Sequence, residues 1–307
     1  MRTPLRHSAW LSEVARGEVF LKLETLQQTN SYKIRGATNA VLKLASSSGG
    51  PRPQIVTASA GNHGRAMAHA AAAAGLHLTV YVPEHAPKTK LEAIEAAGAE
   101  LRLCRDYDEA ERRAKEHGAA GHGVFISPYA HPDVIAGAGT IALEILAEVP
   151  DIDVIVASIG GGGLISGTAI AADGRAEVAG VEVEASTPFT SSLAAGRIVS
   201  IDVGETLADG LSGNLDPDTP TFAIVRQRVE RIAVVSEDDL RRAMHGAARH
   251  EKLIIEGAAA AAVAGVHSGK LDVRGRKVAI VLSGANVDLD RWAEVVASPR
   301  PTLARPT

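Results

Sequence analysis

A lysine stands among small and polar residues in the stretch Thr29-Asn30-Ser31-Tyr32-Lys33-Ile34-Arg35-Gly36-Ala37. An apolar, strand-like run at residues 19–23 precedes it, and apolar residues at helical spacing follow over residues 36–45. We therefore expect Lys33 at or just before the start of a helix. A lysine amine becomes nucleophilic at neutral pH where burial or a neighbouring cation lowers its pKa, and such an amine commonly forms a Schiff base with a carbonyl compound. Taken alone, a lysine near a helix start is more often a solvated surface group.

The composition is that of a globular protein with a small-molecule partner. The chain has 307 residues, of which 46% are hydrophobic and 22% charged, with a formal net charge of -4. This length allows two domains or one large α/β domain. Because no basic block or long charge run is present, we expect no nucleic-acid and no membrane partner. A single cysteine, Cys104, excludes an internal disulfide, and we expect no secretory leader and a cytoplasmic location.

Strand-like and helix-like segments alternate along most of the chain, which predicts an α/β fold of two parallel sheets with helices on both faces. In the first unit the predicted strands are 54–58, 78–82, 101–104 and 124–126, and the helices are 63–74, 88–97 and 108–117. In the second unit the predicted strands are 154–159, 178–183, 232–235 and 277–282, and the main helices are 134–149, 221–228, 238–249, 257–267 and 289–297. Ser236 is predicted to cap the helix that follows it.

A linker of serine, glycine and proline at residues 46–53 interrupts the periodicity and indicates a domain boundary. We predict a large domain from residues 1–53 and 132–307, and a small, mobile domain from residues 54–131. The proline-rich tail at residues 299–307 is expected to be loosely ordered.

Four consecutive glycines, Gly160 to Gly163, follow a strand-like run and precede the helix-like run that begins at Leu164. Glycines allow several backbone N–H groups to converge at a helix N-terminus, which favours a phosphate. A nicotinamide dinucleotide is an alternative ligand, because Glu182 ends the next strand at about the distance of the acid that binds a ribose. A glycine-rich turn without a ligand is the third possibility.

Two further polar loops follow predicted strands. In the loop Thr57-Ala58-Ser59-Ala60-Gly61-Asn62-His63-Gly64, backbone N–H groups of residues 59–62 suit a carboxylate, and Asn62 suits a phenolic oxygen. Helix capping by Ser59 or Asn62 is the alternative. His63 is interpreted as a packed or orienting histidine rather than a base. Ser283 directly follows the predicted strand at 277–282. This is where α/β sheets usually present ligand-binding groups, although a turn serine would also fit.

Together and in this order, the lysine stretch, Ser-Ala-Gly-Asn-His-Gly, the tetraglycine loop and Leu-Ser-Gly-x-Asn-Val resemble the motifs of one family. The chain is similar to the pyridoxal-phosphate enzymes of the tryptophan-synthase-β fold, also called fold type II, and most similar to the threonine/serine dehydratases. The resemblance runs from Pro4 to about Ala297.

The resemblance implies a role for each motif. Lys33 would hold pyridoxal 5'-phosphate as a Schiff base and move the α-proton, while the cofactor acts as an electron sink and its phosphate as the general acid. Asn62 would bind the ring oxygen, Ser283 would face the pyridine nitrogen, and Glu256 would lie near the cofactor. The remaining predicted residues are Gly160, Gly161, Gly162, Gly163 and Leu164 for the phosphate, and Ser59, Ala60, Gly61 and Asn62 for the substrate.

The resemblance predicts a dehydratase that converts L-threonine, L-serine or a related β-hydroxy amino acid to a 2-oxo acid and ammonia. Alternatives are a racemase or β-replacement enzyme of the same fold, a nicotinamide-dependent oxidoreductase, and a protein that binds ligand without turnover. Ala60 stands where serine racemases carry a serine, which favours elimination, and Asn30 replaces a common glycine. Pro188 stands near the position of a cation-binding aspartate, so no metal is predicted. A homodimer without an added regulatory domain is expected.

Overall fold

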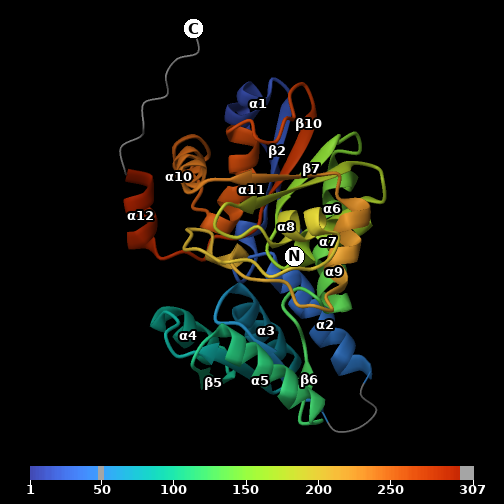
Figure 1. The fold of residues 1–307 in the computed structure, drawn as a ribbon, viewed down its shortest axis with the longest axis vertical. Coiled ribbons are helices and arrows are strands. Elements are labelled where there is room, and N and C mark those ends of the chain that lie inside the picture. Colours follow the sequence, from blue (N-terminus) through green and yellow to red (C-terminus); the bar gives the residue numbers. More distant parts are fainter. Residues whose placement is uncertain (48–51, 298–307) are drawn as a thin grey trace.

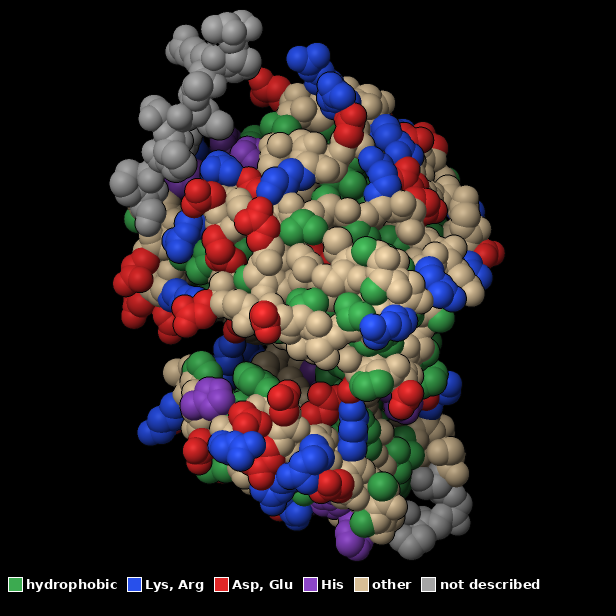
Figure 2. Space-filling view, in the orientation of Figure 1, with side chains coloured by type: hydrophobic (Ala, Val, Ile, Leu, Met, Phe, Trp, Pro, Cys, Tyr) green, Lys and Arg blue, Asp and Glu red, His purple; other side chains and the backbone are tan. Residues whose placement is uncertain are grey.

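The computed structural model describes residues 1–47 and 52–297. These residues form two sheets, one in each of two parts that lie one above the other in Figure 1. The six-stranded sheet has the order β1-β2-β10-β7-β8-β9, and the four-stranded sheet has the order β5-β4-β3-β6. Figure 2 shows the surface hollowed between the two parts, above α4 (Lys88–Glu95). The predicted fold class, α/β with two parallel sheets, is confirmed.

In the larger sheet, β2 (Glu18–Leu23), β10 (Lys277–Leu282), β7 (Val154–Ser158), β8 (Glu177–Val183) and β9 (Arg231–Val235) run parallel to their neighbours. The edge strand β1 (Leu5–His7) pairs with β2 in the antiparallel direction. The strand β1 was not predicted, because three residues are too few to show an alternating pattern. The strands from β10 to β8 are almost fully buried, as expected of a sheet covered on both faces.

Helices cover both faces of this sheet. The helices α1 (Ala9–Ala15), α10 (Glu237–Gly246) and α11 (Gly257–His267) share one apolar core with it, and α12 (Leu289–Ala297) lies against α10. On the other face lie α6 (Pro132–Glu148), α7 (Gly163–Ala172), α8 (Pro188–Ala195) and α9 (Pro220–Arg228). The sequence analysis did not list α8. Residues 257–266 of α11 are all buried, which explains why that segment is apolar all round.

The smaller sheet consists of β5 (Glu100–Cys104), β4 (Leu78–Pro83), β3 (Ile55–Ala58) and β6 (Val124–Phe125), all parallel. The helix α5 (Tyr107–Ala119) packs against one face. The other face shares a core with α3 (Asn62–Ala74), α4 and α2 (Lys33–Ser47). Since α2 also packs against α6, it connects the two parts of the molecule. The domain boundaries proposed above stay a prediction.

Most predicted helix and strand positions agree with the structure to within a few residues. The strand expected at 154–159 ends at Ser158, and the helix expected at 238–249 changes to a π-helical turn over Ala247–Glu251. Ser236 caps α10 as predicted, in a reciprocal pair with Asp239. Parts of the linker (48–51) and the whole tail at 299–307 lie outside the described residues. Within the described parts of the chain, every helix is too short or too polar to cross a membrane.

Candidate active site

The lysine stretch and the Ser283 turn lie side by side at the carboxyl ends of two adjacent strands. Strands β2 and β10 pair in parallel, so the segments that follow them leave the same edge of the sheet. The backbone N–H of Tyr32 donates a 2.9 Å hydrogen bond to the carbonyl of Ser283, and Ser31 forms an isolated β-bridge with Gly284. The Ser283 residue is buried, with 3% of its surface exposed. The structure thus brings together the first and the last predicted motif.

Lys33 is the first residue of α2, as predicted. Its Nζ donates a 2.7 Å hydrogen bond to the carbonyl of Pro128 and lies 5.3 Å from the centre of the Tyr32 ring. Burial lowers the pKa of Lys33 from 10.5 to about 8, against the opposing field of Glu256. The amine is therefore much more nucleophilic near neutral pH than a solvated lysine.

The tetraglycine loop contacts Tyr129, the residue next to Pro128. A Cβ atom at Gly161 would lie 2.4 Å from the Tyr129 ring, and one at Gly163 would lie 2.8 Å from the Tyr129 carbonyl. Gly162 has a φ of +85° and no room for a side chain beside the Phe189 ring. These positions require glycine because the neighbouring atoms already fill the space of a side chain.

The same loop forms the N-terminus of α7, which begins at Gly163. The N–H of Ser166 donates a 2.9 Å hydrogen bond to the carbonyl of Gly162. The N–H groups of the residues before Ser166 have no acceptor within the helix, because the helix has no carbonyl one turn earlier. Leu164 has a buried side chain that packs into the core, which leaves its N–H as the group able to bind a ligand. A glycine-lined helix N-terminus of this kind fits a phosphate.

The Ser59 loop lies before α3, whose first residue is Asn62. Gly64 lies directly against the loop, since a Cβ there would be 2.1 Å from the carbonyl of Ser59. The Ser59 hydroxyl accepts a 3.2 Å hydrogen bond from the N–H of Gly61, and Ala60 is buried. A carboxylate at this turn would meet helix N–H groups and small side chains.

Asn62 joins the small sheet's loop to the larger part of the molecule. Its Nδ2 donates to Oε1 of Glu256 at 2.8 Å, and its Oδ1 accepts from Nδ2 of Asn286 at 2.7 Å. The other carboxylate oxygen of Glu256 accepts the backbone N–H of Asn286 at 3.1 Å. Burial, supported by the field of Asp209, raises the pKa of Glu256 to about 7. Asn62, Glu256 and Asn286 therefore form one partly buried network between loops from both sheets.

His63 is packed, as the sequence interpretation expected. Its Nε2 lies 3.1 Å from Oγ1 of Thr57, whose hydroxyl donates to the carbonyl of Ile126 at 2.7 Å. Because that hydroxyl has a single hydrogen, Nε2 of His63 must be the donor to it. Burial, followed by the charge of Lys33, lowers the pKa of His63 to about 3. The ring is neutral at physiological pH.

Glu182 does not serve the dinucleotide alternative. Its carboxylate accepts the backbone N–H groups of Phe189 and Thr190 at 2.7 and 2.9 Å and the Thr190 hydroxyl at 2.5 Å. It thus caps α8, which begins at Pro188, and it is fully buried there. The suggestion that Glu182 binds a ribose was wrong, because its position at a strand end did not reveal the helix that follows.

Several contacts of the site were not predicted. Pro128 and Tyr129 contact the site but belong to no motif. Thr221 belongs to no motif either, and its hydroxyl donates to the carbonyl of Gly161 at 2.9 Å. Asn286 was quoted within its motif, but no role was assigned to it. Only long-range packing places these residues beside the motifs.

A half-buried lysine of lowered pKa and a glycine-lined helix N-terminus contact the same Pro128–Tyr129 dipeptide. This geometry fits a cofactor that carries both an aldehyde and a phosphate. The chain belongs to the family described as pyridoxal-phosphate dependent enzymes, whose model matches residues 1–284. The cofactor is therefore pyridoxal 5'-phosphate, and the protein is an enzyme of fold type II.

Similar proteins include ammonia-lyases and a racemase. The chain is 40% identical to the L-threonine ammonia-lyase of Thermotoga maritima over 96% of this chain and 74% of that protein. It is 37% identical to the L-threo-3-hydroxyaspartate ammonia-lyase of Saccharomyces cerevisiae, over 96% of this chain and 91% of that protein. Among solved structures, maize serine racemase is similar with a TM-score of 0.88 and 31% identity, over 95% of this chain and 90% of that one.

Proposed function

We propose that the protein is an ammonia-lyase that converts L-threonine, L-serine or a related β-hydroxy amino acid to a 2-oxo acid and ammonia. The observation that carries the proposal is the position of the Lys33 amine, which is desolvated and held beside the residue that packs on the tetraglycine loop. Relatives that are ammonia-lyases support the reaction class.

Lys33 is proposed to hold the cofactor's aldehyde carbon and, once released, to accept the α-proton of the substrate. Its lowered pKa supports this role, because the neutral amine is the form that accepts a proton. The bound cofactor supplies an electron sink for the electrons left when the bond to the α-hydrogen breaks. The carbonyl of Pro128 would orient the amine through the same hydrogen bond as in the structure.

The other motifs are proposed to position the reacting groups. The N–H groups at Gly160, Gly161, Gly162, Gly163 and Leu164 would bind the phosphate. Asn62 would bind the ring oxygen, and the Ser283 hydroxyl would face the ring nitrogen. The loop of Ser59, Ala60, Gly61 and Asn62 would bind the substrate carboxylate. Each assignment is supported by the position of its motif beside Lys33, Tyr129 or Glu256.

We further propose that the small domain closes over the substrate, because Asn62 of its loop bonds directly to Glu256 of the larger part. Binding of an amino acid that completes this network would favour the closed form. We also propose a homodimer and a cytoplasmic location.

The test is a screen of β-hydroxy amino acids, with 3-hydroxyaspartate included, for release of 2-oxo acid by the holoenzyme. We expect turnover of L-threonine, L-serine or 3-hydroxyaspartate, and we expect borohydride reduction to fix the cofactor on Lys33. Lys33→Ala should lower kcat by at least about a thousandfold, since it removes both the attachment point and the base. Lys43→Ala, on an exposed position of the same helix, is the matched control. Reductive labelling of another lysine, or no 2-oxo acid from any of these substrates, would contradict the proposal.

A racemase is the second candidate, because a serine racemase is among the similar structures. Ala60 is the buried residue after Ser59 in this loop, and it has no group that transfers a proton. With one base at Lys33, elimination is favoured over proton return on the opposite face. Chiral chromatography of L-serine after incubation with the wild type and with Ala60→Ser separates the two candidates. We expect D-serine only with the variant, whereas D-serine from the wild type at a rate equal to pyruvate would favour the racemase.

A further inference from the structure

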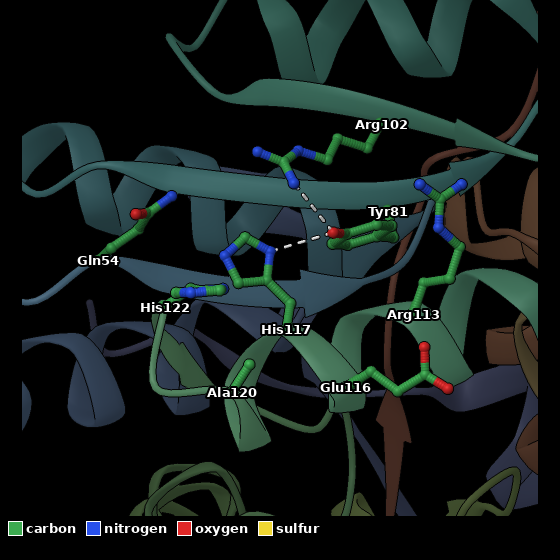
Figure 3. Close-up of a pocket in the computed structure, with 8 residues that line it drawn as sticks. All are labelled: Gln54, Tyr81, Arg102, Arg113, Glu116, His117, Ala120 and His122. Atoms are coloured by element: carbon green, nitrogen blue, oxygen red, sulfur yellow. Dashed lines mark hydrogen bonds between the residues drawn. The ribbon is translucent and has the colours of Figure 1, made fainter.

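A cavity of about 480 Å³ lies on the α5 face of the smaller sheet (Figure 3). Its polar lining comes mainly from Gln54, Tyr81, Arg102, Arg113, His117 and His122, and none of these residues belongs to the candidate active site. The volume is that of a site for a small ligand. The reaction proposed above leaves this cavity without a role.

The Tyr81 hydroxyl is the centre of the polar lining. It lies 3.2 Å from Nη1 of Arg102 and 3.0 Å from Nδ1 of His117. The guanidinium groups of Arg102 and Arg113 lie 5.7 and 5.5 Å from the centre of the Tyr81 ring. Arginine can only donate, so the hydroxyl accepts from Arg102, and it either donates to Nδ1 of His117 or accepts from it.

These hydrogen bonds hold the His117 ring beside the Tyr81 hydroxyl. Burial and the charge of Arg102 lower the pKa of His117, so its ring is neutral near pH 7. Nδ1 of His117 faces the hydroxyl, and Nε2 is on the opposite side of the ring. Figure 3 shows this side of the ring turned towards Gln54 and His122. His117 therefore lines the cavity as a neutral polar group.

The cavity has more cationic donors than its carboxylates neutralise. Arg102 is paired with Glu100 at 2.9 Å, whereas the Arg113 guanidinium has its nearest carboxylate, Glu109, at 4.0 Å. Among the described residues that line the cavity, Glu116 is the one acid, and it is paired with Arg112 at 2.7 Å. Nη1 of Arg113 also donates to the carbonyl of Leu103 at 3.4 Å and to Sγ of Cys104 at 3.7 Å, so Nε and Nη2 are the nitrogens left for an anion.

We propose that this cavity binds a small phosphorylated metabolite, with the phosphate between Arg102 and Arg113. Two planar guanidinium groups match the acceptor oxygens of a phosphate group. The cavity is larger than a phosphate alone requires, which leaves room for a short carbon chain. The Tyr81 ring is buried and both arginines lie over it, so an aromatic base has no exposed ring to stack on.

The proposal is tested by calorimetric titration of the holoenzyme, in which the cofactor's own phosphate site is filled. The probes are inorganic phosphate, 3-phosphoglycerate and glycerate, at constant ionic strength. We expect phosphate and 3-phosphoglycerate to bind and glycerate to bind at least tenfold more weakly. Equal binding of glycerate and 3-phosphoglycerate, or no heat from any probe, would overturn the proposal.

Two variants and a control distinguish a built site from general charge. The double variant Arg102→Gln/Arg113→Gln should weaken 3-phosphoglycerate binding at least tenfold. Tyr81→Phe keeps every positive charge but removes the hydroxyl that positions Arg102, and we expect it to weaken binding about threefold. Arg105→Gln removes an exposed arginine outside the cavity that pairs with Asp106, and it should bind as the wild type does. Equal losses of affinity for 3-phosphoglycerate in Arg105→Gln and in the double variant would show that only net charge matters. Unchanged thermal unfolding would confirm that each variant is folded.

Discussion

The amine of Lys33 donates a 2.7 Å hydrogen bond to the carbonyl of Pro128, and the next residue, Tyr129, packs its ring on Gly161. One dipeptide therefore sets the spacing between the nucleophilic amine and the helix N-terminus that suits a phosphate. A cofactor that spans both groups needs this spacing to be fixed, because a displacement of about 1 Å can cost a hundredfold in rate.

Gly161→Ala should disturb that spacing. The added Cβ would lie 2.4 Å from the Tyr129 ring, so the ring or the loop must move. We expect affinity for pyridoxal phosphate to fall at least tenfold, measured by equilibrium titration of the apoenzyme. Gly204→Ala is the control, because its Cβ would meet Ala185 at an ordinary 3.4 Å. An unchanged cofactor affinity in Gly161→Ala would show that the contact with Tyr129 is not needed.

The pKa of Lys33 predicts a pH dependence of cofactor uptake by the apoenzyme. Burial lowers this pKa from 10.5 to about 8, so the neutral amine becomes the main form above about pH 8. The rate of cofactor attachment should rise through pH 8 and level off above it, as followed by the absorbance of the bound cofactor. A rise that continues to pH 10.5 would mean that the amine is solvated.

The same shift affects stability with a definite sign. Between pH 8 and 10.5 the unfolded chain holds a proton on Lys33 that the folded chain has released. Stability of the apoenzyme therefore gains a favourable contribution as pH rises through this window. Urea unfolding of the wild type and Lys33→Met across the window isolates this contribution, since methionine has no titrating group. Parallel curves for the two proteins would contradict the assignment.

The sequence predicted the motifs of this site better than their surroundings. Lys33, Gly160 and Ser283 each follow a strand-like run, and parallel strands place such residues at one edge of a sheet. The contacts of Pro128 and Tyr129 could not be predicted, because they depend on how two sheets pack through α2. For the same reason the suggestion that Glu182 binds a ribose was wrong, since its hydrogen-bond partners belong to α8, a helix that was not predicted.

Glu256→Gln should change the pH dependence of stability in the opposite direction from Lys33→Met. Burial raises the pKa of Glu256 from 4.5 to about 7, so the folded apoenzyme keeps a proton that the unfolded chain loses between these values. Its contribution to stability is therefore lost as pH rises from 4.5 to 7, by up to about 3 kcal/mol. Glutamine cannot ionise, so the variant should gain stability relative to the wild type over this range. Urea unfolding at several pH values measures the difference.

The matched control for Glu256 is Glu184→Gln, which changes an exposed carboxylate that pairs with Lys270. We expect its stability difference from the wild type to stay flat between pH 4.5 and 7. Glutamine at 256 also loses one acceptor for Asn62 or the Asn286 N–H, which lowers stability equally at every pH. The slope with pH, rather than the offset, is therefore the test. A flat difference for Glu256→Gln would show that this carboxylate titrates normally.

Two ion pairs join the small sheet's helices to the larger part of the molecule, and they should favour the closed form. Lys90 of α4 pairs with Asp209 at 2.7 Å, and Lys115 of α5 pairs with Asp216 at 2.6 Å. Partly exposed pairs of this kind contribute about 0.2–1 kcal/mol each. If closure over the substrate uses both pairs, Lys90→Ala/Lys115→Ala should raise KM about two- to tenfold and change kcat little.

Salt gives the same ion pairs a second, independent test. Added sodium chloride screens exposed charges, so the KM of the wild type should rise with ionic strength while that of the double variant stays nearly constant. Lys88→Ala is the control, because Lys88 pairs with Glu92 inside α4 and is 89% exposed. It should follow the wild type in both KM and salt dependence. A double variant that keeps both wild-type values would show that these pairs do not take part in closure, and would leave the bond between Asn62 and Glu256 as the contact that holds the closed form.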